Sequence, residues 1–203
     1  AVTINQRDYR AWYGLGQTYE LLNLHFYALF YYRRAMTLRP DDARMWCAMA
    51  QCYDNMGRKP EALKCYEKAH RCGDRERMAL PRLARLHNEL GDKRQAVSYY
   101  RQMLAQNGFN IGTAAEPGQD PVDDVTVLGG PLQPRGAGLT ADVVEALRFI
   151  MFFCYEEGRP FECEACANKL LDTNGSEKDE AKAMLRNLRS SSAGPLHRSR
   201  AMS

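Results

Sequence analysis

Residues 9–22 read 9-YRAWYGLGQTYELL-22, a segment that combines one tryptophan, three tyrosines and two glycines. Glycine inside a helix costs about 1 kcal/mol relative to alanine, so Gly14 and Gly16 need a structural reason. A residue without a side chain lets another backbone or ring come very close. The segment therefore predicts a tight helix crossing.

The pattern of this segment returns with a period of thirty-four residues. Trp12 is followed by Trp46, and Gly16 by Ala50 and then Ala84. The same step relates the sets Leu15, Met49 and Leu83; Ala28, Ala62 and Ala96; and Tyr32, Tyr66 and Tyr100. This order of aromatic and small residues is that of the tetratricopeptide repeat, a helix–turn–helix unit. The sequence therefore predicts an all-α superhelix (α-solenoid), with repeats at 9–42, 43–76 and 77–110.

Two positions within the repeat support this interpretation, counting Tyr9, Ala43 and Arg77 as position 1. The small residues at positions 8 and 20 allow the two helices of a unit to approach, which places Gly16 opposite Ala28. Position 15 holds residues that tolerate left-handed backbone angles at a helix end: Asn23, Gly57, Gly91 and, in a fourth unit, Gly158.

The remaining segments are assigned around these repeats. Residues 1–8 match the tail of a preceding, truncated repeat. Residues 111–140 concentrate Gly, Pro and Asp and are expected to form a disordered insert. Residues 141–177 form a divergent repeat with two predicted apolar faces: Leu147, Ile150, Met151 and Cys154, then Cys163, Ala167 and Leu170. An amphipathic capping helix is predicted at 177–189, followed by a flexible tail at 190–203.

Composition excludes several classes of protein. The formal net charge is only +3, whereas nucleic-acid-binding domains usually carry a strongly basic face. No run of eighteen apolar residues predicts a transmembrane helix, and residues 1–10 lack the features of a signal peptide. The seven cysteines lie mostly in periodic apolar segments, as buried thiols do in a reducing compartment. We expect an intracellular protein of the nucleus and cytoplasm, with neither nucleic acid nor membrane as a partner.

Catalytic, metal and cofactor motifs were sought and none is predicted. Cys163 and Cys166 form a CxxC pair, but a zinc site needs further ligands and no second pair exists. The histidines are scattered, and the chain shows no phosphate-binding glycine loop or catalytic triad. The sequence therefore predicts a protein that is not an enzyme and needs no cofactor.

The expected working surface is the concave groove of the repeat stack, formed by positions 2, 5, 9, 12 and 13 of each first helix. Amide side chains there can bond a peptide backbone, and carboxylates at position 12 can receive an arginine or lysine. The candidate groove residues are Arg10, Tyr13, Gln17, Glu20, Arg44, Gln51, Asp54, Asn55, Arg85 and Asn88.

The amino-acid sequence of these repeats is more specific than the general tetratricopeptide-repeat pattern. The segments RDYRAWYGLGQTYELL, YYRRAMTLRPDD, MALPRLARLHNELGD and DEAKAMLRNLR closely resemble the cell division cycle protein 23 (subunit 8) family of the anaphase-promoting complex. The likeness covers nearly everything except 111–140 and the last fourteen residues. It implies a non-catalytic scaffold of a RING-type ubiquitin ligase that controls degradation of mitotic cyclins and securin.

The same resemblance implies the partners. They are other subunits of the complex, activator subunits that bring a basic–aromatic C-box motif to the groove, and a second copy held through more N-terminal repeats. Tyr13, Glu20 and Asp54 suit such a motif.

Two alternatives belong to other classes. The first is a co-chaperone adaptor that holds the C-terminal carboxylate of a heat-shock protein. Its clamp calls for Lys and Asn, where repeat one has Arg10, Tyr13 and Gln17. The second is a targeting arm of an enzyme.

Overall fold

A computed structural model describes residues 7–109, 139–173 and 175–192. Within these ranges the elements are α-helices, as predicted. The chain divides into two compact units, Ala1–Tyr99 and Tyr100–Ser203. The segments predicted as insert (111–140), tail (190–203) and truncated repeat (1–8) fall largely outside the described residues.

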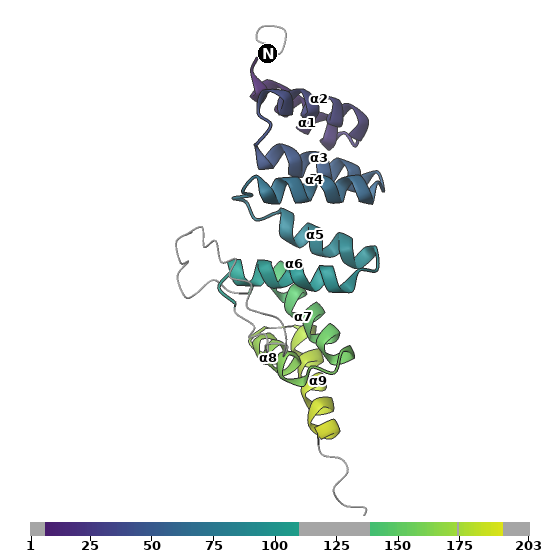
Figure 1. Cartoon of the computed structure of the whole chain (residues 1–203), viewed down its shortest axis with the longest axis vertical. Coiled ribbons are helices and arrows are strands. Elements are labelled where there is room, and N and C mark those ends of the chain that lie inside the picture. Colours follow the sequence, from purple (N-terminus) through teal and green to yellow (C-terminus); the bar gives the residue numbers. More distant parts are fainter. Residues whose placement is uncertain (1–6, 110–138, 174, 193–203) are drawn as a thin grey trace, which may run out of the picture. The chain divides into compact units, whose positions relative to one another are not determined.

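Helices of the first unit pack against one another in chain order (Figure 1). They are α1 (Tyr9–Leu21), α2 (His25–Leu38), α3 (Ala43–Asn55), α4 (Lys59–Arg71) and α5 (Ala79–Glu89), followed by the start of α6 (Lys93–Gln106). α1 packs on α2 and α3 on α4, and the pairs are joined through α2 with α3 and α4 with α5. This arrangement confirms the predicted stack of helical hairpins.

The close approach at Gly16 involves a ring. A Cβ atom added to Gly16 would lie 2.4 Å from Cε1 of Tyr32, and its three nearest atoms all belong to that ring. The sequence pattern places Gly16 opposite Ala28, and the ring beside Gly16 comes from Tyr32, one helical turn further along α2. Tyr32 is fully buried, and a side chain at position 8 would collide with it.

The turns between paired helices follow the prediction for position 15. Asn23 has φ +57°, and the glycines at the equivalent places have φ +73° (Gly57), +86° (Gly91) and +71° (Gly158). These are left-handed conformations, which glycine adopts without strain and asparagine tolerates. They end the first helix of each unit and reverse the chain into the second.

Pro81 does not interrupt α5. The helix begins at Ala79, so Pro81 lies in the first turn, where backbone N–H groups have no partner within the helix. Its ring is buried.

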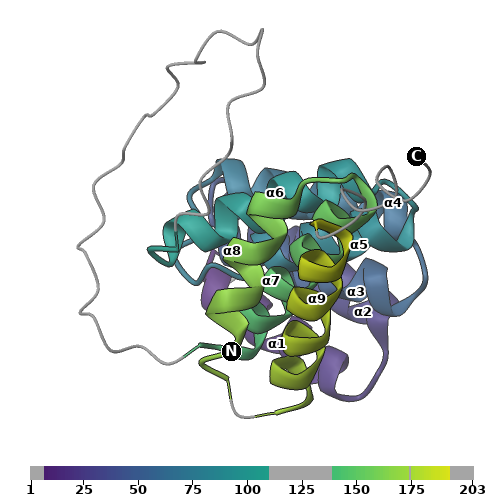
Figure 2. The same cartoon turned by 90° about the horizontal axis from the view of Figure 1, so that it is seen from below.

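The second unit contains the end of α6 and three further helices, α7 (Ala141–Glu156), α8 (Pro160–Leu170) and α9 (Ser176–Ser192). These three helices lie side by side in both views (Figures 1 and 2). All seven residues predicted on the two apolar faces of the divergent repeat are fully buried. α9 packs on α8 with Ala181, Met184 and Leu185 inward. The predicted capping helix is therefore present and extends three residues beyond Arg189.

One charged side chain, Glu162, is buried among the described residues of the second unit. Its carboxylate accepts a hydrogen bond from the Arg101 guanidinium and one at 3.4 Å from the Cys154 thiol. Arg159 Nη1 lies 3.8 Å from the other oxygen. A buried carboxylate is tolerated when it is paired in this way.

Candidate functional site

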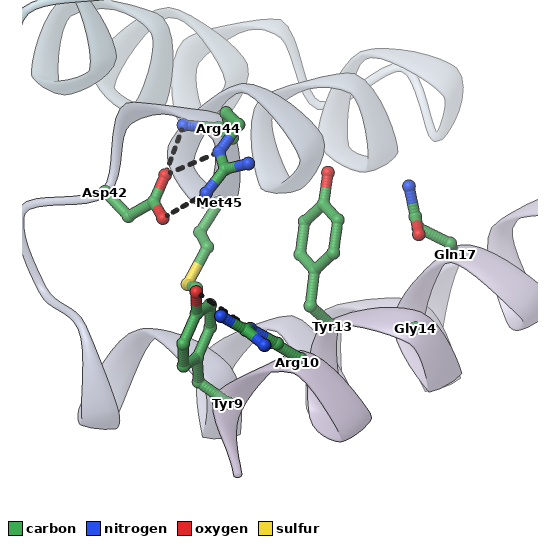
Figure 3. A pocket seen from close by; sticks show the side chains of 8 residues that line it. All are labelled: Tyr9, Arg10, Tyr13, Gly14, Gln17, Asp42, Arg44 and Met45. Carbon is green, nitrogen blue, oxygen red and sulfur yellow. Dashed lines mark hydrogen bonds and ion pairs between the residues drawn. The ribbon is translucent and has the colours of Figure 1, made fainter.

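A cleft of about 220 Å³ lies between α1 and the start of α3 in the first unit. Its lining residues are Tyr9, Arg10, Tyr13, Gly14, Gln17, Asp42, Arg44 and Met45. In Figure 3 the side chains of Tyr13 and Gln17 point from α1 in the same direction, toward the side on which Arg44 lies. Four groove residues predicted from the repeat pattern, Arg10, Tyr13, Gln17 and Arg44, therefore line one cleft.

The helical period explains how α1 contributes its wall. Arg10, Tyr13, Gly14 and Gln17 follow the i, i+3, i+4, i+7 spacing that places residues on one face of a helix. A Cβ atom at Gly14 would meet no atom within 4 Å, so this glycine borders open space. The absence of its side chain widens the cleft, which is a reason for Gly14 that the sequence pattern did not supply.

Asp42 positions the opposite wall. Its Oδ1 accepts a hydrogen bond of 3.1 Å from the backbone N–H of Arg44, which caps α3. The Arg44 guanidinium donates two further hydrogen bonds to the same carboxylate, at 3.2 and 2.9 Å. These bonds hold the pKa of Asp42 below its ordinary value, with the Arg44 side chain as the largest cause. The charge of Arg44 is thereby neutralised within the cleft.

Tyr13 is the aromatic wall of the cleft. It is half-buried, and its ring lies 5.4 Å from that of Tyr32. Burial raises the pKa of the Tyr13 hydroxyl above 10, and the charge of Glu76 raises it further. Its hydroxyl therefore stays protonated at neutral pH and is available as a hydrogen-bond donor.

The other predicted groove residues do not line this cleft. Glu20 is half-buried, and its Oε2 accepts a hydrogen bond of 2.5 Å from the Tyr32 hydroxyl. On α3, Gln51 and Asp54 are half-buried and Asn55 is exposed. On α5, Arg85 is half-buried and Asn88 is exposed.

Several cleft residues were not among the candidates. Tyr9, Asp42 and Met45 line the cleft, and the Glu76 carboxylate acts on Tyr13 from the connection between α4 and α5. The role of Asp42 could have been predicted from the sequence, because an aspartate directly before a helix is a preferred N-cap. Glu76 lies thirty-four residues after Asp42, at the last position of repeat two, which the helix-face positions used for the prediction do not include.

A second cleft of about 700 Å³ adjoins the first and shares Asp42 and Arg44 with it. It lies between residues 39–44, which form the α2–α3 connection and the start of α3, and residues 72–76 of the α4–α5 connection. Its lining alternates arginines with carboxylates: Arg39, Arg44 and Arg75 against Asp41, Asp42, Asp74 and Glu76. Together the clefts offer a peptide both aromatic and charged contacts.

The described residues contain no group of three or more His, Cys, Asp or Glu side chains that could hold a metal ion. Cys163 and Cys166 are both fully buried in the core of the second unit. None of the described helices has the length and apolar character needed to cross a membrane.

Comparison with known proteins identifies the repeats. Sequence models of the tetratricopeptide repeat match residues 9–42, 43–72 and 79–108. No curated protein matched the chain.

Solved structures with the same fold include a tetratricopeptide repeat protein from Parabacteroides merdae (17% identity, 92% of this chain and 62% of that one, TM-score 0.65). They also include YrrB, described as a TPR protein with an unusual peptide-binding site (15% identity, 93% of this chain and 89% of that one, TM-score 0.61). MamA is a third (15% identity, 90% of this chain and 84% of that one, TM-score 0.58). At these identities the likeness concerns the fold. The matches cover residues 9–72 and 79–108, and the stacked hairpins of this part of the chain have the tetratricopeptide-repeat fold.

Proposed function

We propose that this chain is a non-catalytic scaffold that binds an extended peptide of a partner protein at the cleft between α1 and α3. The observation that carries the proposal is the convergence of Arg10, Tyr13, Gln17 and Arg44 on one cleft. A guanidinium, a phenol and an amide side by side supply donors and acceptors for a peptide backbone and an aromatic face for its side chains.

We propose further that the scaffold belongs to the anaphase-promoting complex and receives the C-box-like motif of its activators. The four segments that resemble the cell division cycle protein 23 family support this assignment. A basic–aromatic peptide fits the electrostatics, because Asp42 neutralises Arg44 and the Glu76 carboxylate lies near Tyr13. Asp54 lies outside the cleft, one turn beyond Gln51 on α3, and is proposed as a second carboxylate for a cation of the extended peptide where it continues along the groove.

The test is binding of a fluorescent peptide with a basic–aromatic C-box motif to the full chain, followed by anisotropy. Tyr13→Ala and Asp54→Lys are each expected to weaken binding about tenfold, through loss of the aromatic contact and reversal of a charge. Asp179→Lys in α9 is the matched control, since Asp179 is exposed in the second unit. Glu20→Lys is a poor probe because it also removes the partner of Tyr32.

Equal affinity of the wild type, Tyr13→Ala and Asp54→Lys for the peptide would refute the groove assignment. Tighter binding of a peptide that ends in Glu-Glu-Val-Asp would favour the co-chaperone alternative, whose ligand is acidic. Affinity purification of the full-length protein tests the assignment to the complex, with cullin-like and RING subunits expected among the recovered proteins.

A further inference from the structure

The first repeat exposes an unusual set of large apolar side chains. The outer apolar patch, as we name it, consists of Leu21, Leu22, Leu24, Phe26, Tyr27 and Phe30. Their exposed fractions run from 44% for Leu24 to 84% for Leu21. They extend from the end of α1 through the turn into α2, with Phe26 and Phe30 one helical turn apart on the same face.

Comparison with repeats two and three shows that four of these positions carry no large apolar side chain there. Positions 13, 16, 18 and 22 hold Leu21, Leu24, Phe26 and Phe30 in repeat one. In repeat two they hold Asn55, Arg58, Pro60 and Lys64, and in repeat three Glu89, Asp92, Arg94 and Ser98. All eight of these residues are exposed.

Repeat two argues against the explanation that a neighbouring repeat normally covers the positions of the patch. α3 packs against α2 of repeat one and α4 packs against α5 of repeat three, so repeat two has a neighbour on each side. Arg58 and Lys64 nevertheless remain exposed. Stacking of repeats therefore does not cover these positions, and the apolar residues of repeat one are not explained as a surface awaiting another repeat.

Two aromatic rings of the patch, Tyr27 and Phe30, pack against other aromatic rings of repeat one. Tyr27 stacks on the half-buried Tyr19 at 5.5 Å between ring centroids, and Tyr19 stacks in turn on Tyr31 at 5.1 Å. Phe30 packs edge-on against Tyr31 at 5.3 Å. Aromatic side chains held in this way lose little freedom on binding, as is common at protein–protein contacts.

Charge indicates the kind of partner. α2 contains no Asp or Glu, and the guanidinium of Arg34 lies 5.6 Å from the centroid of the Phe30 ring. The patch therefore has a basic edge. Two copies of the patch would bring like charges together. A membrane surface normally needs a cluster of at least about four basic residues, whereas α2 contains two arginines, Arg33 and Arg34.

We propose that the outer apolar patch is a docking surface for a partner protein segment that presents apolar side chains flanked by carboxylates. The site is separate from the cleft between α1 and α3, because the two share no residue. The scaffold then holds two different segments, one through polar groups and one through apolar contacts.

The test selects peptides that bind the full chain from a random peptide phage library. Phages that also bind the double variant Phe26→Lys/Phe30→Lys are removed by counter-selection. Peptides that distinguish the two are expected to combine Leu, Ile or Phe with neighbouring Asp or Glu. A synthetic peptide of the selected sequence should bind the wild type at least tenfold more tightly than the double variant. Ser98→Lys, at position 22 of repeat three, should leave its affinity unchanged.

Tyr13→Ala and Asp54→Lys should also leave this affinity unchanged, so the outcome is independent of the cleft. Three results would overturn the proposal. They are selected peptides that lack acidic residues, binding of the wild type but not the double variant to anionic lipid vesicles, and self-association of the wild type that the double variant loses. Circular dichroism of the double variant should match the wild type, because both substituted side chains are exposed.

Discussion

In repeat one the buried Tyr32 hydroxyl donates a hydrogen bond to Glu20 at 2.5 Å. In repeat two the equivalent hydroxyl of Tyr66 has no hydrogen-bond partner among the residues that the structure describes. The two tyrosines occupy the same position of the repeat and both are buried. The difference lies at position 12, where Asp54 is one methylene shorter than Glu20. The repeat pattern thus determines the backbone and the core, while single methylenes decide which polar groups are satisfied.

The same two repeats differ at positions 8 and 10. Gly16 leaves room for the Tyr32 ring, whereas Ala50 is accommodated in repeat two with its methyl fully buried. Thr18 is exposed on α1, whereas Cys52 is fully buried on α3, in the helix that packs against α2. Each difference provides a test of how closely the repeats are equivalent.

The largest expected effect is a difference in thiol reactivity at position 10. Burial and the charge of Glu20 raise the pKa of Cys52 to about 12. At pH 8 such a thiol carries about a thousandth of the thiolate of an ordinary one. We expect the thiol introduced by Thr18→Cys to react with iodoacetamide at least about a thousand times faster than Cys52. Peptide mass spectrometry measures both rates, and similar rates would show that repeats one and two separate in solution.

A second comparison concerns the two glycines of α1. Gly16→Ala is expected to lower the free energy of unfolding by about 2 kcal/mol, because the new methyl meets the buried ring of Tyr32. Gly14→Ala is the control in the same helix, where the methyl meets nothing within 4 Å. It should raise the free energy of unfolding by up to about 1 kcal/mol. Urea titration distinguishes them, and equal changes would contradict the close contact at Gly16.

The tyrosine pair itself is tested by removal of each hydroxyl. Tyr32→Phe is expected to cost about 1.5 kcal/mol, because it leaves the part-buried Glu20 carboxylate without its donor. Tyr66→Phe should change stability by less than about 0.5 kcal/mol, since no bond is lost. Chemical denaturation at pH 7 measures both, and a larger cost for Tyr66→Phe would show that its hydroxyl is bonded.

The Tyr32 hydroxyl also makes stability depend on pH. Burial, and secondly the bond to Glu20, raise the pKa of Tyr32 above its ordinary value of 10. Because the pKa of Tyr32 is higher in the folded than in the unfolded protein, the protonated hydroxyl contributes its full stability below pH 10. This contribution is lost as the pH rises above 10. Unfolding free energies measured from pH 8 to 11 should therefore fall above pH 10, and fall less steeply in Tyr32→Phe.

Much of this fold could be predicted from the sequence, because the helix pairs and turns follow from a period that is visible in single residues. The small residues at positions 8 and 20, and Asn or Gly at position 15, are local requirements of backbone geometry. The position of the Tyr32 ring beside Gly16 was not predictable in this way. It depends on the rotamer that the ring adopts within the packed core.

The candidate site was predicted in part. The period identified Arg10, Tyr13 and Gln17, which share a face of α1, and Arg44 at the start of α3. The second wall depends on the connections between repeats, where Asp42 clamps Arg44 and Glu76 acts on Tyr13. The connections lie outside the helix faces used for the prediction, and their side chains are positioned by contacts between segments distant in the chain.

The smallest expected effect comes from exchanging the turn residues of the two repeats. Gly57→Asn should lower the free energy of unfolding by about 0.5 kcal/mol, and Gly57→Ala by about 1 kcal/mol, because φ is +73° there and the cost is backbone strain. Nothing lies within 4 Å of an added Cβ at Gly57, so a steric clash does not contribute. Asn23→Gly relieves the strain at φ +57° but increases the freedom of the unfolded chain, and these effects oppose each other. Thermal unfolding measures all three variants. We expect a net change below about 0.5 kcal/mol for Asn23→Gly and a larger loss for Gly57→Ala than for Gly57→Asn. Both results together would show that the two turns differ in side chain but share one backbone conformation.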